Sequence, residues 1–574
     1  MVATTPDETA RWLDHARRVA TGAALVLFAA VAIAFVRTIV GSWHATGDQA
    51  LIELRTFDVG GRHTPLVGPY SRYGWSHPGP ALFYALAPVL RVFGGHDTGL
   101  LAGALAINAL ALGALFSVAW RRHDAAAFVL VVLVTAILVR APSAQPLFDP
   151  WNPYVIVLPL LAAAICAWSA AAGSRWALIA SVVLASFVAQ SHIGAALPAA
   201  ALAALALLWT ALGTRRASPA ARRRRVRSIA YALAAIVVVW IPPIVQAVTS
   251  GGGNLREIWD FWTASHAATG YARGARLVSP QFAIPAPWMG ATEHTSLGGA
   301  LLPSTNRFPV ALVVLALVTF VSARRRDRDA IALCSLAWAF ALTTWIAASG
   351  IVDVPFPYLL RWAWVAGALV WLTIAWGCWR AIPPRGGRAR AVTLVAGAVG
   401  ACVVGVFVAV SAARSPLPVP TESHTLTAIR GPVLAALRRA PGPVLVETGS
   451  SLPAANVAAG LFLEATRAGI PVRVPAPDGY RVGSARALHG RPGSILLVAD
   501  AGADPRVRGG AYRLVAGYDA LTAADRVELD ALLARVGGQL ARLVALERDH
   551  PHDYARLRTL KAHDVRVAVF LGTG

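Results

Sequence analysis

The sequence predicts an α-helical membrane protein with about eleven spanning helices, followed by a soluble α/β domain. Two observations predict the membrane part: 56% of the 574 residues are hydrophobic and only 14% are charged, and the mean hydropathy is +0.57. Such a composition is typical of multi-spanning proteins rather than soluble ones. A third observation, a change in composition after Ser411, predicts the α/β domain.

The net charge of +23 does not indicate nucleic-acid binding. Lys561 is the only lysine, and much of the arginine lies in short loops between hydrophobic segments, where membrane topology places basic residues. We therefore expect contact with membrane lipids and no nucleic-acid partner. The four cysteines all fall within hydrophobic segments and lack metal-ligand spacing, so we interpret them as small buried residues.

The first hydrophobic run, residues 21–40, has roughly the 20 residues that a bilayer requires, and it lacks the small-residue cleavage site of a signal peptide. Arginines precede this run within residues 1–20, which we therefore expect to be cytoplasmic. Together with ten further spans, it makes up a transmembrane domain over residues 21–411. The ten spans are 98–119, 124–140, 154–173, 176–191, 194–213, 228–248, 308–323, 329–349, 357–378 and 390–411.

Four arginine clusters set the expected orientation. They lie at 121–122, 215–227, 324–326 and 385–390, and each belongs on the cytoplasmic side. If segment 80–94 crossed the membrane, all four clusters would lie on the outer side. Its roughly 15 residues also fall short of the 17–25 that a span needs. We expect it to form an interfacial helix on the outer surface. The chain is then a multi-pass protein of the cell membrane with its C-terminal domain outside.

The C-terminal part begins with a proline-containing linker, residues 412–422, and continues as an α/β domain over 423–574. Short apolar runs alternate there with helical patterns, which is typical of an α/β arrangement. Strands are expected at 444–447, 472–474, 494–500 and 565–571, and helices at 454–468 and 522–546. This domain shows no glycine-rich phosphate fingerprint, and we assign it no chemistry.

The outer side receives the polar loops, above all 41–97 and 249–307. Within the first of these, residues 47–80 contain three acids, three arginines, two histidines and three Tyr or Trp rings. Titratable groups concentrated beside a membrane indicate a functional site. Outer-loop candidates elsewhere are the Asp149-Pro-Trp-Asn-Pro153 segment, His192, and the Tyr358 to Arg361 segment.

This first loop resembles that of the C-type glycosyltransferase superfamily (GT-C), in particular the branch of protein O-mannosyltransferases and lipid A aminoarabinose transferases. In that branch an acid follows the first span and opens an interfacial helix, and a basic-Pro-Pro element leads to a second one. Here Asp48 matches the acid, 51–57 and 81–93 match the two helices, and His77-Pro78 matches the basic-Pro element. Two departures are Gln49, where a second acid is usual, and Gly79 between the two prolines.

The resemblance implies transfer of a sugar from a polyprenyl-phosphate donor to an envelope glycan, lipid or protein on the outer face. Asp48 would be the general base that accepts the proton of the acceptor hydroxyl. An arginine would stabilise the departing phosphate, and the candidates are Arg72, Arg55 and Arg361, of which we expect Arg72, Arg361 or both to contact it. Aromatic rings would contact the sugar. The predicted substrate-binding residues are Glu53, Arg55, Arg72, Tyr73, His77, His192, Tyr358 and Arg361. A cofactor is not required, and the first loop has no Asp-x-Asp pair that would indicate a divalent cation.

Structural alternatives exist for these residues. Asp48 precedes an apolar-periodic run and has the residue type of a helix N-cap. The alternative for His77 and His192 is a packing role. The alternative for Glu53 is an ion pair with Arg55, and for Arg361 it is a position at the membrane interface. The rival function is a transporter or flippase of a lipid-linked precursor. A transporter is expected to carry polar groups at mid-membrane depth and internal repeats, and the spans contain few charges.

Overall fold

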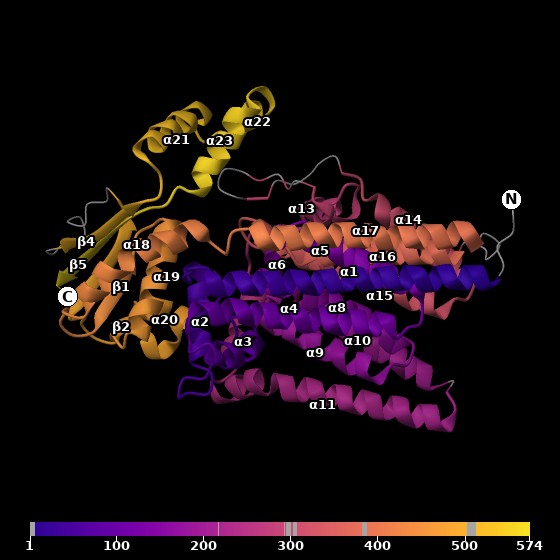
Figure 1. Ribbon diagram of the computed structural model, residues 1–574. Helices are drawn as coiled ribbons and strands as arrows, with labels where there is room; N and C mark the ends of the chain where they lie inside the picture. The colour runs from indigo at the N-terminus through magenta and orange to yellow at the C-terminus, as the bar shows by residue number, and fades with distance from the viewer. Residues whose placement is uncertain are drawn as a thin grey trace.

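The computed structural model describes residues 6–215, 217–291, 293, 295, 300–301, 307–381, 387–501 and 512–573. A long helical bundle makes up most of it, and a sheet-containing C-terminal domain lies at one end (Figure 1). We call this end of the bundle the domain end.

Eight helical stretches of the described residues are long and apolar enough to cross a membrane. They are Ala10–Val40, Asp97–Trp120, Asn152–Ala171, Ile193–Thr214, Pro219–Thr249, Arg328–Ser349, Pro357–Ala381 and Ala389–Arg414. The helices that form them are α1 (Pro6–Val40), α4 (Asp97–Trp120), α7 (Asn152–Val155) with α8 (Val157–Ala171), η1 (Ile193–Ala195) with α10 (Ala196–Thr214), α11 (Pro219–Thr249), α15 (Arg328–Ser349), η4 (Pro357–Leu360) with α16 (Ala363–Ala381), and α17 (Gly387–Arg414).

The three remaining predicted spans are present as shorter apolar helices. They are α5 (Ala125–Arg140), α9 (Arg175–Ser191) and α14 (Val310–Arg324), with 16, 17 and 15 residues. At about 1.5 Å per residue they are about 22–26 Å long, somewhat less than the hydrocarbon core of about 30 Å. The polytopic helical fold class is confirmed, and the crossing of these three helices stays a prediction.

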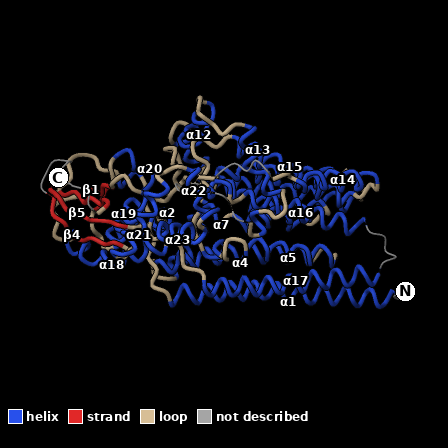
Figure 2. The backbone as a smooth tube through the Cα atoms, turned by 90° about the horizontal axis from the view of Figure 1, so that it is seen from above, coloured by secondary structure: helices blue, strands red, loops and turns tan. Residues whose placement is uncertain are grey.

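Two long helices, α1 and α17, run side by side along one edge of the bundle (Figure 2). Small residues permit this contact: a Cβ added at Gly405 of α17 would lie 3.3 Å from a methyl group of Val26 in α1. Close approach at small residues is the usual way in which membrane helices pack. The stretch Asn152–Ala171 lies at the centre of the bundle, because 89% of its most apolar 18-residue segment is buried.

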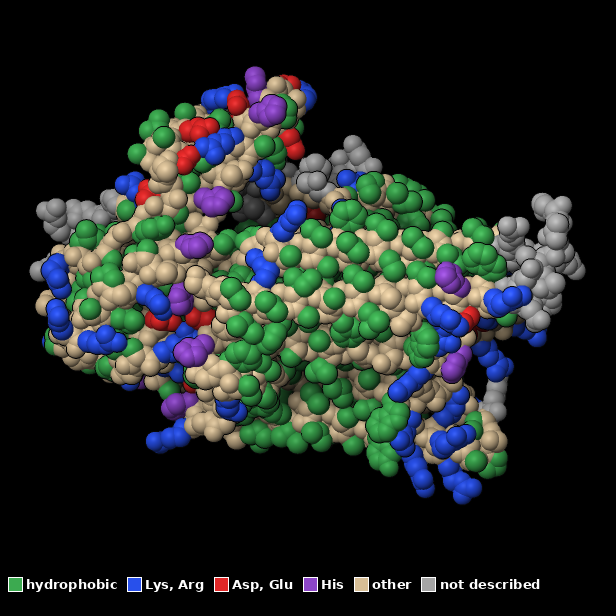
Figure 3. Space-filling view, viewed as in Figure 1, with side chains coloured by type: hydrophobic (Ala, Val, Ile, Leu, Met, Phe, Trp, Pro, Cys, Tyr) green, Lys and Arg blue, Asp and Glu red, His purple; other side chains and the backbone are tan. Residues whose placement is uncertain are grey.

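Basic side chains gather at the end of the bundle away from the C-terminal domain (Figure 3). Arg17 donates to the backbone oxygen of Trp120 at 2.8 Å, and Arg122 pairs with Asp329 at 2.5 Å. Arg325 donates to the backbone oxygen of Arg380 at 3.4 Å. These contacts join the ends of α1, α4, α15 and α16, and they place the domain end on the other side of the apolar bundle.

Two short helices at the domain end correspond to the predicted interfacial helices. They are α2 (Gly47–Phe57) and α3 (Ala81–Val92). The 12 residues of α3 span about 18 Å, which is too short for a crossing and fits an interfacial position. The long loop after α11 contributes α12 (Gly253–Thr263), α13 (Tyr271–Val278), η2 (Ser279–Phe282) and η3 (Pro287–Met289), and α6 (Gln145–Phe148) precedes α7.

The C-terminal domain contains a five-stranded sheet with strand order β2-β1-β3-β5-β4. Its strands are β1 (Val444–Thr448), β2 (Val472–Arg473), β3 (Ser494–Asp500), β4 (Tyr512–Asp519) and β5 (Arg566–Thr573). The pairs of β1 with β2 and β3 are parallel, whereas β5 is antiparallel to β3 and β4. Four strands were predicted, and β4 was not: its residues are largely half-buried or exposed, and its apolar run is only three residues long, Leu514 to Ala516.

Helices of the C-terminal domain differ from the prediction mainly at one glycine. α18 (Pro420–Leu437) and α19 (Leu452–Arg467) pack beside the sheet, followed by η6 (Ala476–Asp478), α20 (Gly479–Val482) and η7 (Ser484–Arg486). The predicted helix 522–546 is divided into α21 (Ala523–Val536) and α22 (Leu540–Asp549) because Gly537 adopts a left-handed conformation with φ 56°. α23 (Pro551–Ala562) follows, and these three helices share a small core of their own.

Candidate active site

A small antiparallel hairpin, residues 68–77, positions much of the first loop. The backbone N–H of Gly68 donates to His77 O at 2.9 Å, that of His77 to Pro69 O at 2.7 Å, and that of Ser71 to Trp75 O at 2.8 Å. The side chain of Asn254 in α12 clamps the hairpin from the second loop, because it exchanges hydrogen bonds of 2.7 and 2.8 Å with the backbone of Ser76. The two predicted outer loops therefore form one structure.

Asp48 lies in the first turn of α2, but Thr46 is the N-cap residue of that helix. The structural alternative, Asp48 as the N-cap residue, is therefore wrong. Its carboxylate instead accepts a hydrogen bond from the Tyr70 hydroxyl, while the positive end of the helix dipole favours the negative charge. Burial raises the pKa of Asp48, and hydrogen bonds from Tyr70 and Trp151 together with the charge of Arg481 act in the opposite direction.

Asp48 lies in the wall of a cavity of about 130 Å³ at the domain end. This cavity brings together six of the nine residues predicted from the sequence: Asp48, Arg72, Tyr73, His77, His192 and Tyr358. Other aromatic residues complete the wall, namely Tyr70, Trp75, Trp151, Phe261 and Trp262. A single carboxylate in an aromatic enclosure is the kind of site that binds a sugar ring beside a proton acceptor.

The two histidines of the cavity stack on each other, with ring centroids 5.2 Å apart. Nδ1 of His77 accepts a hydrogen bond of 3.1 Å from the backbone N–H of Ile193. Burial lowers the pKa of His77 well below its ordinary value, and the neighbouring His192 adds to this effect. Burial also lowers the pKa of His192 to about 4. Both rings are therefore neutral at physiological pH, and they enter the site as hydrogen-bonding groups rather than cations.

Arg72 is the cation that the sequence prediction and the cavity share. One of its terminal nitrogens donates to Val352 O at 2.7 Å and to Val354 O at 3.1 Å, and its guanidinium carbon lies 4.8 Å from the ring centroid of Tyr73. Tyr73 also donates to Val352 O at 2.7 Å. These contacts tie the hairpin to the segment between α15 and η4, and they hold the guanidinium at the edge of the cavity.

The other three predicted residues do not lie in the lining of this cavity, as far as the described residues show. Glu53 is fully buried and pairs with Arg467 of α19. Arg55 pairs with Asp58 at 2.5 Å, although it also lines a gap of about 20 Å³ next to Asp48. Glu53 and Arg55 thus belong to the contact between α2 and the C-terminal domain.

Arg361 lines a different cavity, of about 530 Å³, together with Glu293. The two form an ion pair of 3.1 Å, and the indole N–H of Trp364 donates to the same carboxylate at 3.2 Å. The structure therefore does not bring Arg361 together with Asp48.

An apolar groove lies further along α15. Its volume is about 480 Å³, and it is lined by residues of α13, η2, α14 and α15, among them Phe282, Leu312, Trp338 and Trp345. The cavity of Asp48 contacts the same helix at Ala347 and Gly350, so the two spaces follow one another along the last turns of α15.

The C-terminal domain docks on α2 through half-buried arginines. Arg467 pairs with Asp97 at 2.9 Å and with Glu464 at 2.7 Å, in addition to Glu53. Asp97 and Glu464 form, with His44, a group whose ligand atoms lie close enough to hold a metal ion. The guanidinium of Arg467 already supplies positive charge to both carboxylates, so we assign no ion to this group.

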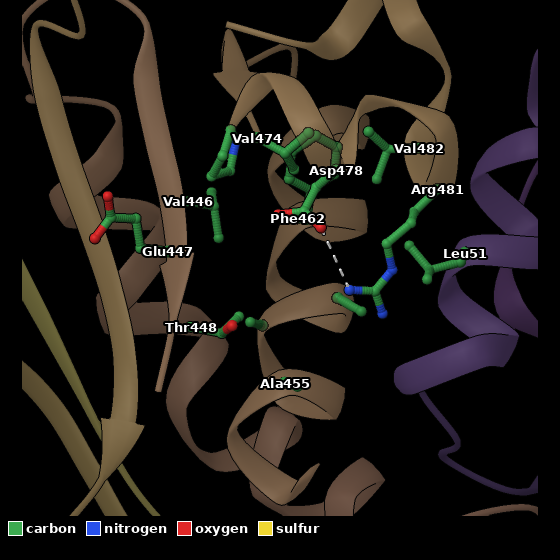
Figure 4. A pocket seen from close by; sticks show the side chains of 13 residues that line it. Leu51, Val446, Glu447, Thr448, Ala455, Phe462, Val474, Asp478, Arg481 and Val482 are labelled. Atoms are coloured by element: carbon green, nitrogen blue, oxygen red, sulfur yellow. Dashed lines mark ion pairs between the residues drawn. The ribbon is translucent and has the colours of Figure 1, made fainter. Parts of the chain in front are cut away.

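A further pocket, of about 300 Å³, lies between α2 and the C-terminal domain (Figure 4). It is formed by the end of β1, by α19, and by the segment after β2, with Leu51 of α2 on the opposite side. Arg481 extends into this pocket beside Leu51 of α2, and its guanidinium lies 3.9 Å from the carboxylate of Asp478. Leu51 and Arg481 also line the small gap beside Asp48, so this pocket adjoins the candidate active site.

Sequence reasoning missed several residues of the site. Trp151 and Asn152 are not among them, because they belong to the segment 149–153, which the sequence indicated as an outer-loop candidate. Phe261 and Trp262 lie on α12 in the long second loop, and Arg481 lies in a soluble domain more than 400 residues from Asp48. No local pattern connects these residues to the first loop.

The fold is similar to that of ArnT from Cupriavidus metallidurans. The crystal structure of that protein bound to undecaprenyl phosphate matches with a TM-score of 0.53 and 14% identity, over 86% of this chain and 95% of that chain. The structure in the apo state matches over the same shares with a TM-score of 0.50 and 13% identity. No protein-family model and no curated protein sequence matches this chain. The likeness confirms the polytopic helical fold that the composition and the hydrophobic runs predicted.

Proposed function

We propose that this protein, which has the fold of the C-type glycosyltransferases, transfers a sugar from a polyprenyl-phosphate donor to a hydroxyl of an envelope glycan, lipid or protein. The observation that carries the proposal is the position of Asp48, a half-buried carboxylate in an aromatic cavity that is followed by an apolar groove along α15. The undecaprenyl phosphate bound by the similar ArnT supports a donor of this class.

Each part of the reaction has a residue suited to it. The acceptor hydroxyl attacks the anomeric carbon, and Asp48 takes its proton. Burial raises the pKa of Asp48 toward the operating pH, where a general base is most effective. The bond between the sugar and the phosphate breaks, and the charge of Arg72 stabilises the departing phosphate. The neutral histidines and the aromatic rings of the wall hold the sugar.

We further propose that the site faces the outside of the cell. The arginine clusters lie at the end of the bundle away from the domain end, and basic clusters favour the cytoplasmic side. The sugar would then be transferred on the outer face, where envelope glycans, lipids and proteins are available as acceptors.

The experiment is a transfer assay with the purified protein in lipid nanodiscs. Undecaprenyl phosphate carrying radiolabelled mannose, glucose, arabinose or N-acetylglucosamine is supplied in turn, with envelope membranes as the source of acceptor. We expect label to enter the acceptor fraction, or to be released as free sugar, with at least one donor, and this turnover to be lost in Asp48→Asn. Transbilayer movement of a donor without cleavage of its sugar–phosphate bond would instead establish a transporter.

A further inference from the structure

The C-terminal domain reaches the candidate active site through one short helix. Within α20, Tyr480 donates a hydrogen bond of 3.3 Å to the backbone oxygen of Ser71 in the hairpin. The next residue, Arg481, lies over the ring of Tyr70, with its guanidinium carbon 4.6 Å from the ring centroid. Tyr480 and Arg481 of the C-terminal domain thus contact the hairpin that contains Tyr70, the hydrogen-bond partner of Asp48.

Arg481, Tyr70 and Asp48 form a hydrogen-bonded series. Nη2 of Arg481 donates to the Tyr70 hydroxyl at 3.4 Å, and that hydroxyl donates its own proton to Asp48. A positive donor behind a hydroxyl strengthens the bond that the hydroxyl donates in turn. Asp48 therefore receives a stronger hydrogen bond when Arg481 is in place.

We propose that Arg481 is a positioning residue of the transfer reaction, which acts through Tyr70 to hold the Asp48 carboxylate in place and ionised. The inference rests on the proposed function of Asp48 as the base. It assigns to the C-terminal domain a share in the active site, because undocking of this domain removes the positive charge of Arg481 from the Tyr70 hydroxyl that donates to Asp48.

The electrostatics agree with this geometry. Burial raises the pKa of Asp48, and the charge of Arg481 lowers it. Tyr70 has a pKa raised by burial and by the charge of Asp48, so its hydroxyl stays protonated and remains a donor. The other titratable groups that line the cavity and the gap beside Asp48 are Arg55 of α2, Arg72, Tyr73 and His77 of the hairpin, His192, Tyr358 of η4 and Tyr480 of α20. Asp149 before α7 also interacts electrostatically with Asp48.

Two ion-pair groups hold Arg481 at this position. On one side Arg467 pairs with Glu53 and Asp97, and on the other Arg486 pairs with Asp58 at 2.7 Å. Close packing fixes the same contact, because a Cβ added at Gly47 would lie 2.7 Å from Oδ1 of Asn456 in α19. The domain therefore presents Arg481 to the site from a docked position, not from a free tether.

The test measures the protonation of Asp48 without any donor. Dicyclohexylcarbodiimide modifies protonated carboxyl groups in apolar surroundings, so its attachment to Asp48, followed by peptide mass spectrometry, reports the titration of this residue. The variants are Arg481→Gln and Arg481→Lys. The matched control is Arg486→Gln, which loses a docking ion pair, that with Asp58, and keeps Arg481. All are compared with the full-length protein in nanodiscs.

We expect the labelling midpoint of Asp48 to rise by about one pH unit in Arg481→Gln, to return toward wild type in Arg481→Lys, and to stay unchanged in Arg486→Gln. The acid limb of transfer activity should move by the same amount. Equal midpoints in wild type and Arg481→Gln, or an equal shift in Arg486→Gln, would overturn the inference. A wild-type protein that cleaves no donor would overturn the proposed function instead, since labelling needs no donor.

Discussion

Gln49 donates a hydrogen bond of 3.2 Å from its Nε2 atom to Oδ1 of Asp149, a residue 100 positions further along the chain. Asp149 is buried, and it also accepts from Gln145 at 3.2 Å and from the backbone N–H of Trp151 at 2.9 Å. The resemblance implies an acid at position 49. A carboxylate at position 49 would face and repel the carboxylate of Asp149, whereas the amide of Gln49 donates a hydrogen bond to it. The presence of Asp149 therefore accounts for glutamine in place of an acid.

The first prediction concerns the buried Asp149. Burial raises its pKa from 3.8 to about 6, which means that the folded protein holds this proton more tightly than the unfolded chain does. Its contribution to stability is therefore fully present at low pH and is lost as the pH rises through about 6. The shift corresponds to roughly 3 kcal/mol at most.

Asp149→Asn removes this titration and keeps an acceptor for Gln49. We expect the melting temperature of the wild type to fall, relative to that of Asp149→Asn, between about pH 4 and pH 7. Thermal unfolding of both proteins in the same detergent across this range checks the prediction. Melting curves that stay parallel at every pH would contradict it.

The second prediction concerns Asp48→Asn. Asparagine keeps the size of the side chain and an oxygen that accepts from Tyr70, but it cannot take a proton. The protein should accumulate in the membrane and bind undecaprenyl phosphate normally, while transfer falls by about 10²–10⁴-fold. Radiolabel transfer normalised to folded protein gives the measurement. Retention of more than roughly a third of the wild-type rate, far outside that range, would remove Asp48 as the base.

The third prediction concerns the donor phosphate, for which the sequence indicated Arg72, Arg361 or both. Arg72 lines the cavity of Asp48, whereas Arg361 is paired with Glu293 in a separate one. We expect Arg72→Gln to weaken binding of undecaprenyl phosphate roughly ten- to a hundredfold, since a charge-assisted contact contributes about 1.5–3 kcal/mol. Arg361→Gln is the matched comparison. Equal affinity of Arg72→Gln and the wild type in a titration would rule out this contact.

The fourth prediction concerns orientation. Arg439, at the exposed start of the C-terminal domain, is replaced by cysteine, and the native Cys378 is exposed near the opposite end of the bundle. We expect a membrane-impermeant maleimide to label Arg439→Cys in intact cells and Cys378 only after permeabilisation. The reverse order would overturn the proposed orientation and, with it, the outer-face site.

Several features followed from the sequence by itself. Apolar runs of about 20 residues have only one favourable arrangement in a bilayer, so the helical class and most span positions could be read directly. The first loop likewise identified Asp48, Arg72, Tyr73 and His77, because a concentration of polar and aromatic groups beside a span is a local property of the chain.

Only the tertiary structure decided how distant segments combine around that loop. Glu53 looks like its neighbours in sequence, yet docking of α19 commits it to an ion pair with Arg467 of the C-terminal domain. The same docking brings Arg481 to Tyr70, and α12 brings Phe261 and Trp262. These contacts depend on the packing of elements hundreds of residues apart, and neither periodicity nor spacing within one segment encodes that packing.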